Sequence, residues 1–218
     1  MDNLKKTTAY LLSTGFSEII LVGAAIIAGM ALPVLPTQIL WTNIIEEGFM
    51  NFAFAFEPKE DNLMKRDPKG WSSKDLLSKN LRRLIIVISS ITSVFLLILF
   101  FSISKAGYSL EEIRTIMFAG ISIDSIFFAF SLKNFKKPIW KIHIFSNMYL
   151  VFSLILSIAL LAAALFLAPL QKLLSIAPLS AFELLLVFSV GIFNLITIEA
   201  AKYFLFEKAG RWNKINKK

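Results

Sequence analysis

The chain of 218 residues contains no cysteine and a single histidine. Without cysteine it has no disulfides, no thiolate-bound metal and no thiol catalysis. His143 has no second histidine to join it in a metal site, so we interpret it as a surface residue of a basic loop. The sequence also has no internal repeat. This argues against a self-sufficient secondary carrier, because many such carriers are built from inverted repeats.

Apolar residues, in contrast, are abundant: they make up 56% of the chain, with 21 phenylalanines and a mean hydropathy of +0.69, too hydrophobic for an ordinary soluble domain. Because about 20 apolar residues span the core of a bilayer, we predict an all-α, polytopic membrane protein with a bundle of six transmembrane helices. The predicted helices cover residues 7–31, 37–56, 84–103, 116–132, 148–167 and 181–206. The first is too long for a cleaved signal peptide and contains Glu18.

Lysine and arginine lie mainly at the two ends of the chain and in alternate loops. By the positive-inside rule, both termini and the long polar loop 57–83 are predicted to be cytoplasmic. The net charge of +8 is then explained by helix orientation and by contact with anionic lipid head groups, without any nucleic acid partner. We expect a multi-pass protein of the cell membrane, with the lipid bilayer as its immediate partner.

The first two predicted helices carry most of the polar residues found inside apolar segments. Glu18 lies about 17 Å into the first helix at the usual helical rise, and Glu46 and Glu47 lie at a similar depth in the second. An ionisable side chain at the bilayer centre costs at least ~2.5–3.5 kcal/mol, so it is retained mainly where it faces the bundle interior and acts on an ion or a proton. On a helix, Asn43 would lie near both glutamates of the second segment.

Neighbouring residues could complete a site around these acids. Ser17 adds a hydroxyl oxygen close to Glu18, while Gly15 and Gly48 permit close approach or local unwinding of the backbone, which would free carbonyl oxygens. The ligand set contains only oxygen, so it suits calcium, magnesium, manganese, sodium or protons better than copper or zinc. The pattern therefore predicts a site for a hard cation.

Two other acids lie in later helices. Asp124, in the fourth, is either an additional ligand or proton relay, or an acid that faces the bundle and hydrogen-bonds the neighbouring Ser122 and Ser125. Glu199, three residues before Lys202 in the last helix, is interpreted as half of a structural ion pair.

Three segments near the start of the chain contain recognisable motifs. One has the pattern Pro-x-x-Pro-x-Gln-x-Leu-Trp-x-Asn followed by an acid and glycine, the next has Phe-Glu-Pro and Met-Lys-Arg, and an earlier one leads to Glu18. The residues concerned are Asn3, Leu4, Lys5, Lys6, Tyr10, Leu11, Leu12, Ser13, Glu18, Pro33, Pro36, Gln38, Leu40, Trp41, Asn43, Glu47, Gly48, Phe56, Glu57, Pro58, Met64, Lys65 and Arg66. With these motifs the chain resembles the C-terminal membrane half, the fifth to tenth helices, of a P-type cation-transporting ATPase of the calcium, sodium/potassium and proton pump branch.

The resemblance implies cation ligands at Glu18, Asn43 and Glu47. Glu46 lies where the family's calcium pumps usually carry a threonine ligand, and Gly15 lies where they carry an asparagine. Both departures make the site more anionic, so a proton or a different divalent ion remains open beside calcium.

Other parts of the family have no counterpart in this sequence: the phosphorylated Asp-Lys-Thr-Gly motif, the nucleotide-binding domain, the Thr-Gly-Glu loop and the Pro-Glu motif of the fourth helix. We therefore assign no catalytic residue and no bound cofactor, and expect no ATP hydrolysis by this chain alone. ATP and magnesium would act through a partner chain or an N-terminal half. The leading hypothesis is a cation-binding and translocation module; the alternative is a non-catalytic membrane partner or regulator of a complete pump.

Overall fold

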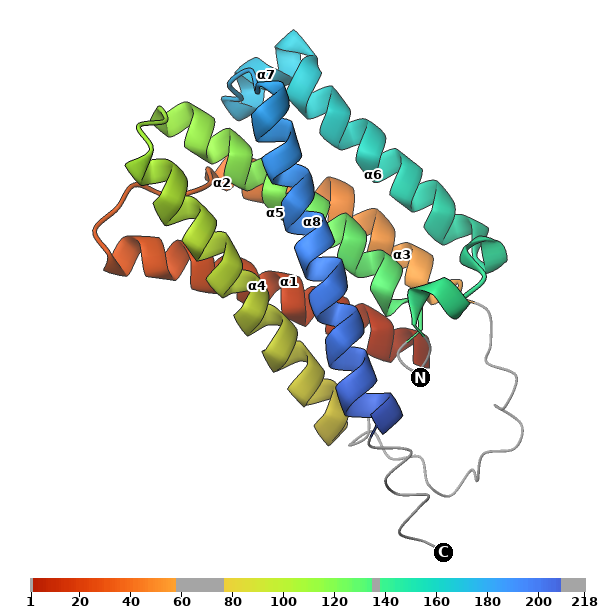
Figure 1. Ribbon diagram of the computed structural model, residues 1–218. Coiled ribbons are helices and arrows are strands. Elements are labelled where there is room, and N and C mark those ends of the chain that lie inside the picture. The colour runs from red at the N-terminus through yellow and green to blue at the C-terminus, as the bar shows by residue number, and fades with distance from the viewer. Residues whose placement is uncertain (1, 58–76, 135–137, 209–218) are drawn as a thin grey trace, which may run out of the picture.

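The computed structural model describes residues 2–57, 77–134 and 138–208, without the side chains of residues 2, 45–47, 144 and 206–208. Over these ranges all regular secondary structure is helical and no strand occurs, which confirms the all-α prediction (Figure 1). Most of the predicted loop 57–83 and the end of the chain lie outside the described residues.

Among the described residues, five helices are long and apolar enough to cross a membrane. They are α1 (Asp2–Ile27), α4 (Lys79–Lys105), α5 (Leu110–Leu132), α6 (Met148–Phe166) and α8 (Ala181–Lys202). Each overlaps one of the predicted segments, although α1 begins and ends earlier and α4 and α5 begin earlier than predicted. Side chains of Ser78, Ser109, Asn147 and Ser180 cap the first turns of α4, α5, α6 and α8.

The second predicted segment is helical, but it is not one regular α-helix. It consists of α2 (Pro36–Trp41), the π-helix η1 (Thr42–Glu47) and α3 (Gly48–Ala55). The N–H of Gly48 donates to the carbonyl of Asn43, five residues back, which is the hydrogen bond of a π turn. The expected backbone irregularity is thus present beside Gly48, whereas α1 continues as an α-helix through Gly15.

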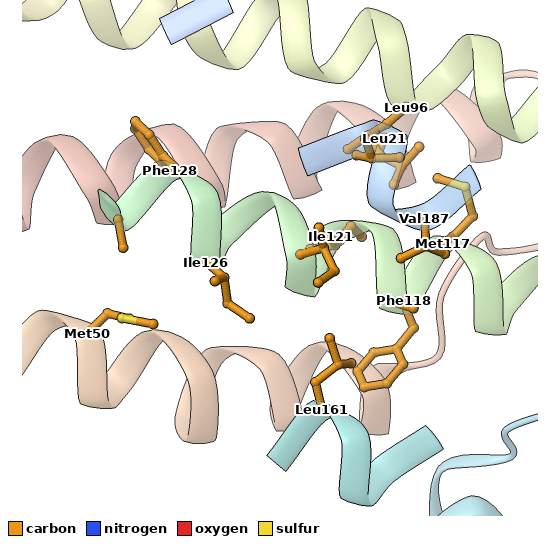
Figure 2. Packing of buried hydrophobic residues seen from close by; sticks show 14 of the residues in the cluster. Leu21, Met50, Leu96, Met117, Phe118, Ile121, Ile126, Phe128, Leu161 and Val187 are labelled. Atoms are coloured by element: carbon orange, nitrogen blue, oxygen red, sulfur yellow. The ribbon is translucent and has the colours of Figure 1, made fainter. Parts of the chain in front are cut away.

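Helix α5 is the central helix of the bundle. In the 18-residue apolar stretch of α5, 89% of the residues are buried, against 33–50% in the corresponding stretches of the other four long helices. In Figure 2, Met117 of α5 lies on the side of Val187 of α8, while Phe118 faces Leu161 of α6. Because α5 packs against neighbouring helices on opposite faces, most of its residues are buried, including polar ones such as Ser122 and Asp124.

Side-chain contacts define one end of the bundle. Gln38 of α2 donates from Nε2 to the carbonyl of Leu174, the last residue of α7 (Ala168–Leu174), at 3.0 Å. At the same end Arg114 of α5 donates to the carbonyl of Leu32 at 3.2 Å. The short hairpin between α1 and α2 is therefore held both to α5 and to the end of α7.

The opposite end collects the first turn of α1 and the ends of α3, α5 and α8. Lys202 of α8 donates from Nζ to the carbonyl of Ser131 of α5 at 2.9 Å, and Asn147 at the start of α6 donates to the carbonyl of Ala53 of α3 at 3.0 Å. Short helical turns, η5 (Ile139–Lys141) and η6 (Ile144–Ser146), connect α5 to α6 here, and the π-helix η7 (Tyr203–Lys208) extends α8. The segment α2–η1–α3 thus runs from one end of the bundle to the other.

A first prediction concerns the stability of the hairpin. Gln38 is fully buried, and its Oε1 also accepts the N–H of Leu35 at 2.8 Å. We expect Gln38→Leu to lower the unfolding free energy of the purified chain in detergent by about 1–3 kcal/mol, because two backbone groups lose their partners. Thr37→Ala, at an exposed neighbouring position, is the control. Equal thermal stability of the two variants would contradict the role of Gln38.

Candidate functional site

The two glutamate-bearing segments meet where the sequence predicts a site. Asn43 of η1 donates from Nδ2 to Oε2 of Glu18 of α1 at 3.4 Å. The other oxygen, Glu18 Oε1, is buried and has no hydrogen-bond partner among the described residues. Glu18 and Asn43 are therefore neighbours in the structure, and one carboxylate oxygen of Glu18 is unpaired among the described residues.

The backbone of η1 brings Glu46 and Glu47 into the same turns as Asn43. Their side chains lie outside the described residues, so their role as ligands stays a prediction. A π turn rotates the side chains that follow it about the helix axis, and π-bulges are frequent at functional sites. Among the described side chains, no group of three acidic, histidine or cysteine residues could hold a metal ion.

The hydrogen bond between Asn43 and Glu18 lies at an exposed surface, although Glu18 is itself half-buried and its Oε1 is buried. The prediction that the acids face the interior of the bundle stays a prediction, because the side chains of Glu46 and Glu47 lie outside the described residues. Asn43 and its neighbour Ile44 are exposed, as are Ile19 and Phe16 of α1. Neither α5 nor the other described helices cover this face of α1 and η1, so these polar groups lie at the margin of the bundle.

The hydroxyl groups near Glu18 are directed mainly at the backbone. Ser17 Oγ donates to the carbonyl of Ser13 at 2.9 Å and lies 3.5 Å from the carbonyl oxygen of Ser89 in α4. Thr14 Oγ1 donates to the carbonyl of Tyr10 at 3.0 Å. The oxygen of Ser17 can still accept or coordinate, but its position is set by packing of α1 against α4.

Asp124 is placed in a second polar cluster, between α4, α5 and α8. It is buried beside Asn194 of α8, whose Oδ1 accepts a hydrogen bond from Thr92 of α4 at 3.0 Å. Ser125 donates instead to the carbonyl of Ser122, so the serines expected to bond Asp124 are not the partners seen among the described residues. Sequence reasoning missed the hydrogen bond between Thr92 and Asn194, because these residues lie 102 positions apart and become adjacent only when α4 packs against α8.

The residues interpreted as structural behave as predicted. Glu199 Oε1 lies 2.7 Å from Lys202 Nζ, and Glu199 Oε2 accepts the N–H of Ile139, so this pair joins α8 to the loop after α5. His143 is exposed at the surface. These residues therefore do not belong to the polar groups around Glu18.

Comparison with known proteins connects this geometry to a family. Residues 31–204 match the family model described as "Cation transporting ATPase, C-terminus". The chain is 33% identical over 150 residues to "Probable cation-transporting ATPase F" of Mycobacterium tuberculosis, covering 69% of this chain and 16% of that protein. It is 27% identical over 216 residues to "Calcium-transporting ATPase 1" of Bacillus cereus, covering 92% of this chain and 24% of that protein.

A human relative extends the comparison. "Calcium-transporting ATPase type 2C member 1" of Homo sapiens is 27% identical over 199 residues, covering 91% of this chain and 21% of the relative. The chain thus spans between about a sixth and a quarter of the length of these relatives. The matched region contains Asn43, both glutamates of η1 and Asp124.

Proposed function

Since this chain belongs to the family of P-type cation-transporting ATPases, as their C-terminal membrane region, we propose that it is the cation-binding and translocation module of an ATP-driven pump. The observation that carries the proposal is the buried, unpartnered Oε1 of Glu18 beside the hydrogen bond from Asn43. ATP would be hydrolysed by phosphorylation and nucleotide-binding domains that this sequence does not include.

In this proposal Glu18, Asn43 and Glu47 are the principal ligands, and Glu46 adds a second carboxylate in the same turns. Carboxylate and amide oxygens are the ligands that hard cations prefer. A π turn in the ligand-bearing segment supports the assignment, because irregular backbone at membrane depth is tolerated where it lines a cavity or is covered by protein. Asp124 is proposed as an additional ligand or proton acceptor, since it is buried beside a second amide, that of Asn194.

The open face of α1 and η1 indicates how the site is completed. A carboxylate in contact with hydrocarbon is costly, so another protein segment is expected to cover Glu18 and Asn43. We propose that a helix of the pump outside this sequence covers them and contributes further oxygen ligands. The module would then bind its cation tightly only in the assembled pump.

The proposed membrane topology rests on the number of spans and on the distribution of basic residues. The segment α2–η1–α3 runs the length of the bundle, which supports a sixth membrane span beside the five long helices. With six spans, and with the basic residues concentrated at the end that holds Lys6, Lys133 and Lys202, both termini are proposed to be cytoplasmic. We propose the cell membrane as the location.

Calcium is the first ion to test, because two of the relatives carry the name calcium-transporting ATPase. The glutamate at position 46 and the glycine at position 15 keep a proton or another divalent ion as the other candidates. The three candidate ions are distinguished by what stimulates ATP hydrolysis. Calcium transport predicts stimulation by Ca²⁺, transport of another divalent ion predicts stimulation by Mn²⁺ or Mg²⁺, and proton transport predicts stimulation by acid pH without any added metal.

The test uses the assembled pump in membrane vesicles, with Asn43→Ala as the variant. We expect the concentration of the activating cation at half-maximal ATP hydrolysis to rise roughly two- to tenfold, as for one lost neutral hydrogen-bonding group. Asn80→Ala, which removes an amide in the first turn of α4, is the control. Unchanged cation activation in Asn43→Ala would remove this residue from the site.

A further inference from the structure

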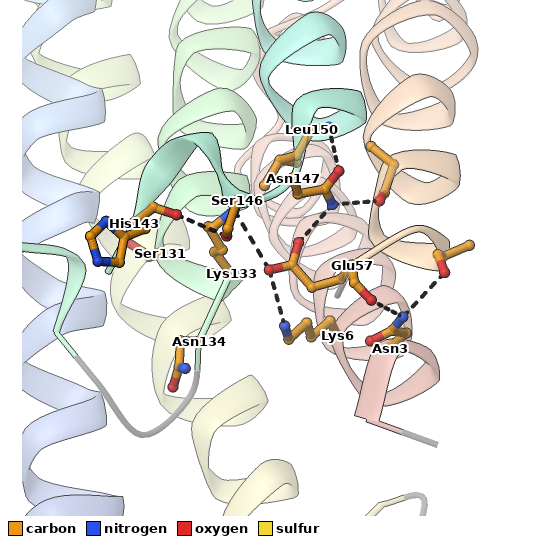
Figure 3. A network of polar contacts seen from close by, with 12 residues as sticks. Asn3, Lys6, Glu57, Ser131, Lys133, Asn134, His143, Ser146, Asn147 and Leu150 are labelled. Atoms are coloured by element: carbon orange, nitrogen blue, oxygen red, sulfur yellow. Dashed lines mark hydrogen bonds and ion pairs between the residues drawn. The ribbon is translucent and has the colours of Figure 1, made fainter. Parts of the chain in front are cut away.

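A further polar cluster, separate from that of Asp124, surrounds Glu57, two residues beyond the end of α3 (Figure 3). The Glu57 side chain is buried, and its Oε2 accepts a hydrogen bond from Nδ2 of Asn147 at 2.7 Å. Its Oε1 lies 3.7 Å from Nζ of Lys6 and 3.6 Å from Nζ of Lys133. One carboxylate therefore contacts α1, the end of α5 and the start of α6.

Hydrogen bonds from side-chain amides to backbone carbonyls reinforce the same junction. Asn3 Nδ2 donates to the carbonyls of Glu57 at 2.9 Å and of Ala55 at 3.1 Å, which joins the first turn of α1 directly to the end of α3. Asn147 donates to the carbonyl of Ala53 from the other side. We call this group the Glu57 cluster; it consists of Asn3, Lys6, Glu57, Lys133 and Asn147.

Charge makes Glu57 the central member. Lys6 and Lys133 are only 4% and 3% exposed. Burial lowers the pKa of Lys133, and the carboxylate of Glu57 opposes this shift because it favours the charged ammonium. If the carboxylate is neutralised, two buried ammonium groups lose an opposite charge, and the ends of α1 and α5 are expected to move apart or admit water.

The cluster and the cation site lie on the same two helical segments. Lys6 precedes Glu18 on α1 by about 18 Å, and Asn43 precedes Glu57 on η1 and α3 by about 21 Å, at the usual helical rise. The bond between Asn43 and Glu18 is already long, at 3.4 Å. A small tilt or slide of α3 against α1, if their ends were released, would be enough to break it.

We propose that Glu57 is a positioning residue, which fixes the end of α3 against α1 and thereby sets the distance between the cation ligands Glu18 and Asn43. This role rests on the proposed function as a cation-translocating module. Glu57 does not touch the cation itself; it acts through the two helices that carry the ligands.

The experiment compares Glu57→Gln with wild type in the assembled pump, with Ca²⁺, Mn²⁺ and acid pH as probes of cation-activated ATP hydrolysis. Glutamine keeps the size of the side chain and a hydrogen bond to Asn147 but removes the charge. We expect the activating cation concentration at half-maximal rate to rise about five- to twentyfold, with a smaller change in the maximal rate. Glu57→Asp, which restores the charge, should recover most of the affinity.

A merely structural role would lower the amount and thermal stability of assembled pump but leave the half-maximal concentration unchanged; that result would overturn the proposal. If Glu57→Gln does not accumulate, Lys133→Gln, which weakens the same junction while Lys6 remains, must show the affinity shift. Wild type without cation-activated ATP hydrolysis would overturn the proposed function, and the positioning role with it. Normal wild-type activation with an unshifted variant would overturn the positioning role alone.

Discussion

Replacing Glu18 by glutamine is expected to shift the cation-activated ATP hydrolysis of the assembled pump to much higher cation concentrations. Glutamine has nearly the same size and can keep a hydrogen bond to Asn43, so the variant isolates the charge of the carboxylate. Interactions with a charged group are worth about 1.5–3 kcal/mol, so the half-maximal cation concentration should rise roughly 10- to 100-fold. The measurement is ATP hydrolysis in vesicles as a function of cation concentration.

Glu111→Gln is the matched control for this prediction. Glu111 is an exposed residue in the first turn of α5, and the hydrogen bond it accepts from Thr115 goes to its backbone carbonyl rather than to its carboxylate. This variant should activate like wild type. If Glu18→Gln also activated like wild type, Glu18 would not be a cation ligand.

Replacing Gly191 by alanine is expected to give a large loss of stability. Gly191 lies where α8 crosses α5, and an added Cβ would lie 2.5 Å from Cγ2 of Ile123 and 2.7 Å from Cδ2 of Phe127. Since α5 is the central helix, the two helices would have to separate or repack. Overpacking of this kind costs about 1–3 kcal/mol, to be measured as thermal unfolding of the purified chain in detergent.

Gly120→Ala provides the comparison within the same helix pair. A Cβ added to Gly120 of α5 would lie 3.7 Å from Cγ2 of Val190, an ordinary van der Waals contact. Alanine also favours the helix over glycine by up to about 1 kcal/mol, so this variant should be neutral or stabilising. Equal destabilisation by both substitutions would show that α5 and α8 do not approach closely at Gly191.

Much of the fold could be predicted from local sequence. Apolar runs long enough to span a bilayer identify the five long helices, and the prolines at positions 33 and 36 predict the tight hairpin after α1. The nearness of Glu18 and Asn43 could also be predicted, because two antiparallel helices joined by a short hairpin carry them at similar depth. The ion pair of Glu199 with Lys202 follows from helical spacing alone.

The remaining features depend on packing between distant segments. The π turn in η1 is a choice between backbone hydrogen bonds that differ little in local energy, so the pattern predicts a helix but not its register. Asp124 lies near the amide of Asn194, 70 residues away in the chain, and the Glu57 cluster joins four helical segments. The exposed position of Asn43 also could not be predicted, because hydropathy shows which residues avoid water but not which helices surround them.

Cation uptake into sealed vesicles that contain the assembled pump tests the proposed function most directly. We expect ATP to drive accumulation of one hard cation by wild type, and we expect the double variant Glu18→Gln/Glu47→Gln to lose this uptake while Glu111→Gln retains it. Uptake that the double variant carries out at the wild-type rate, or that needs no ATP, would contradict the assignment of this chain as the cation-binding module of a pump.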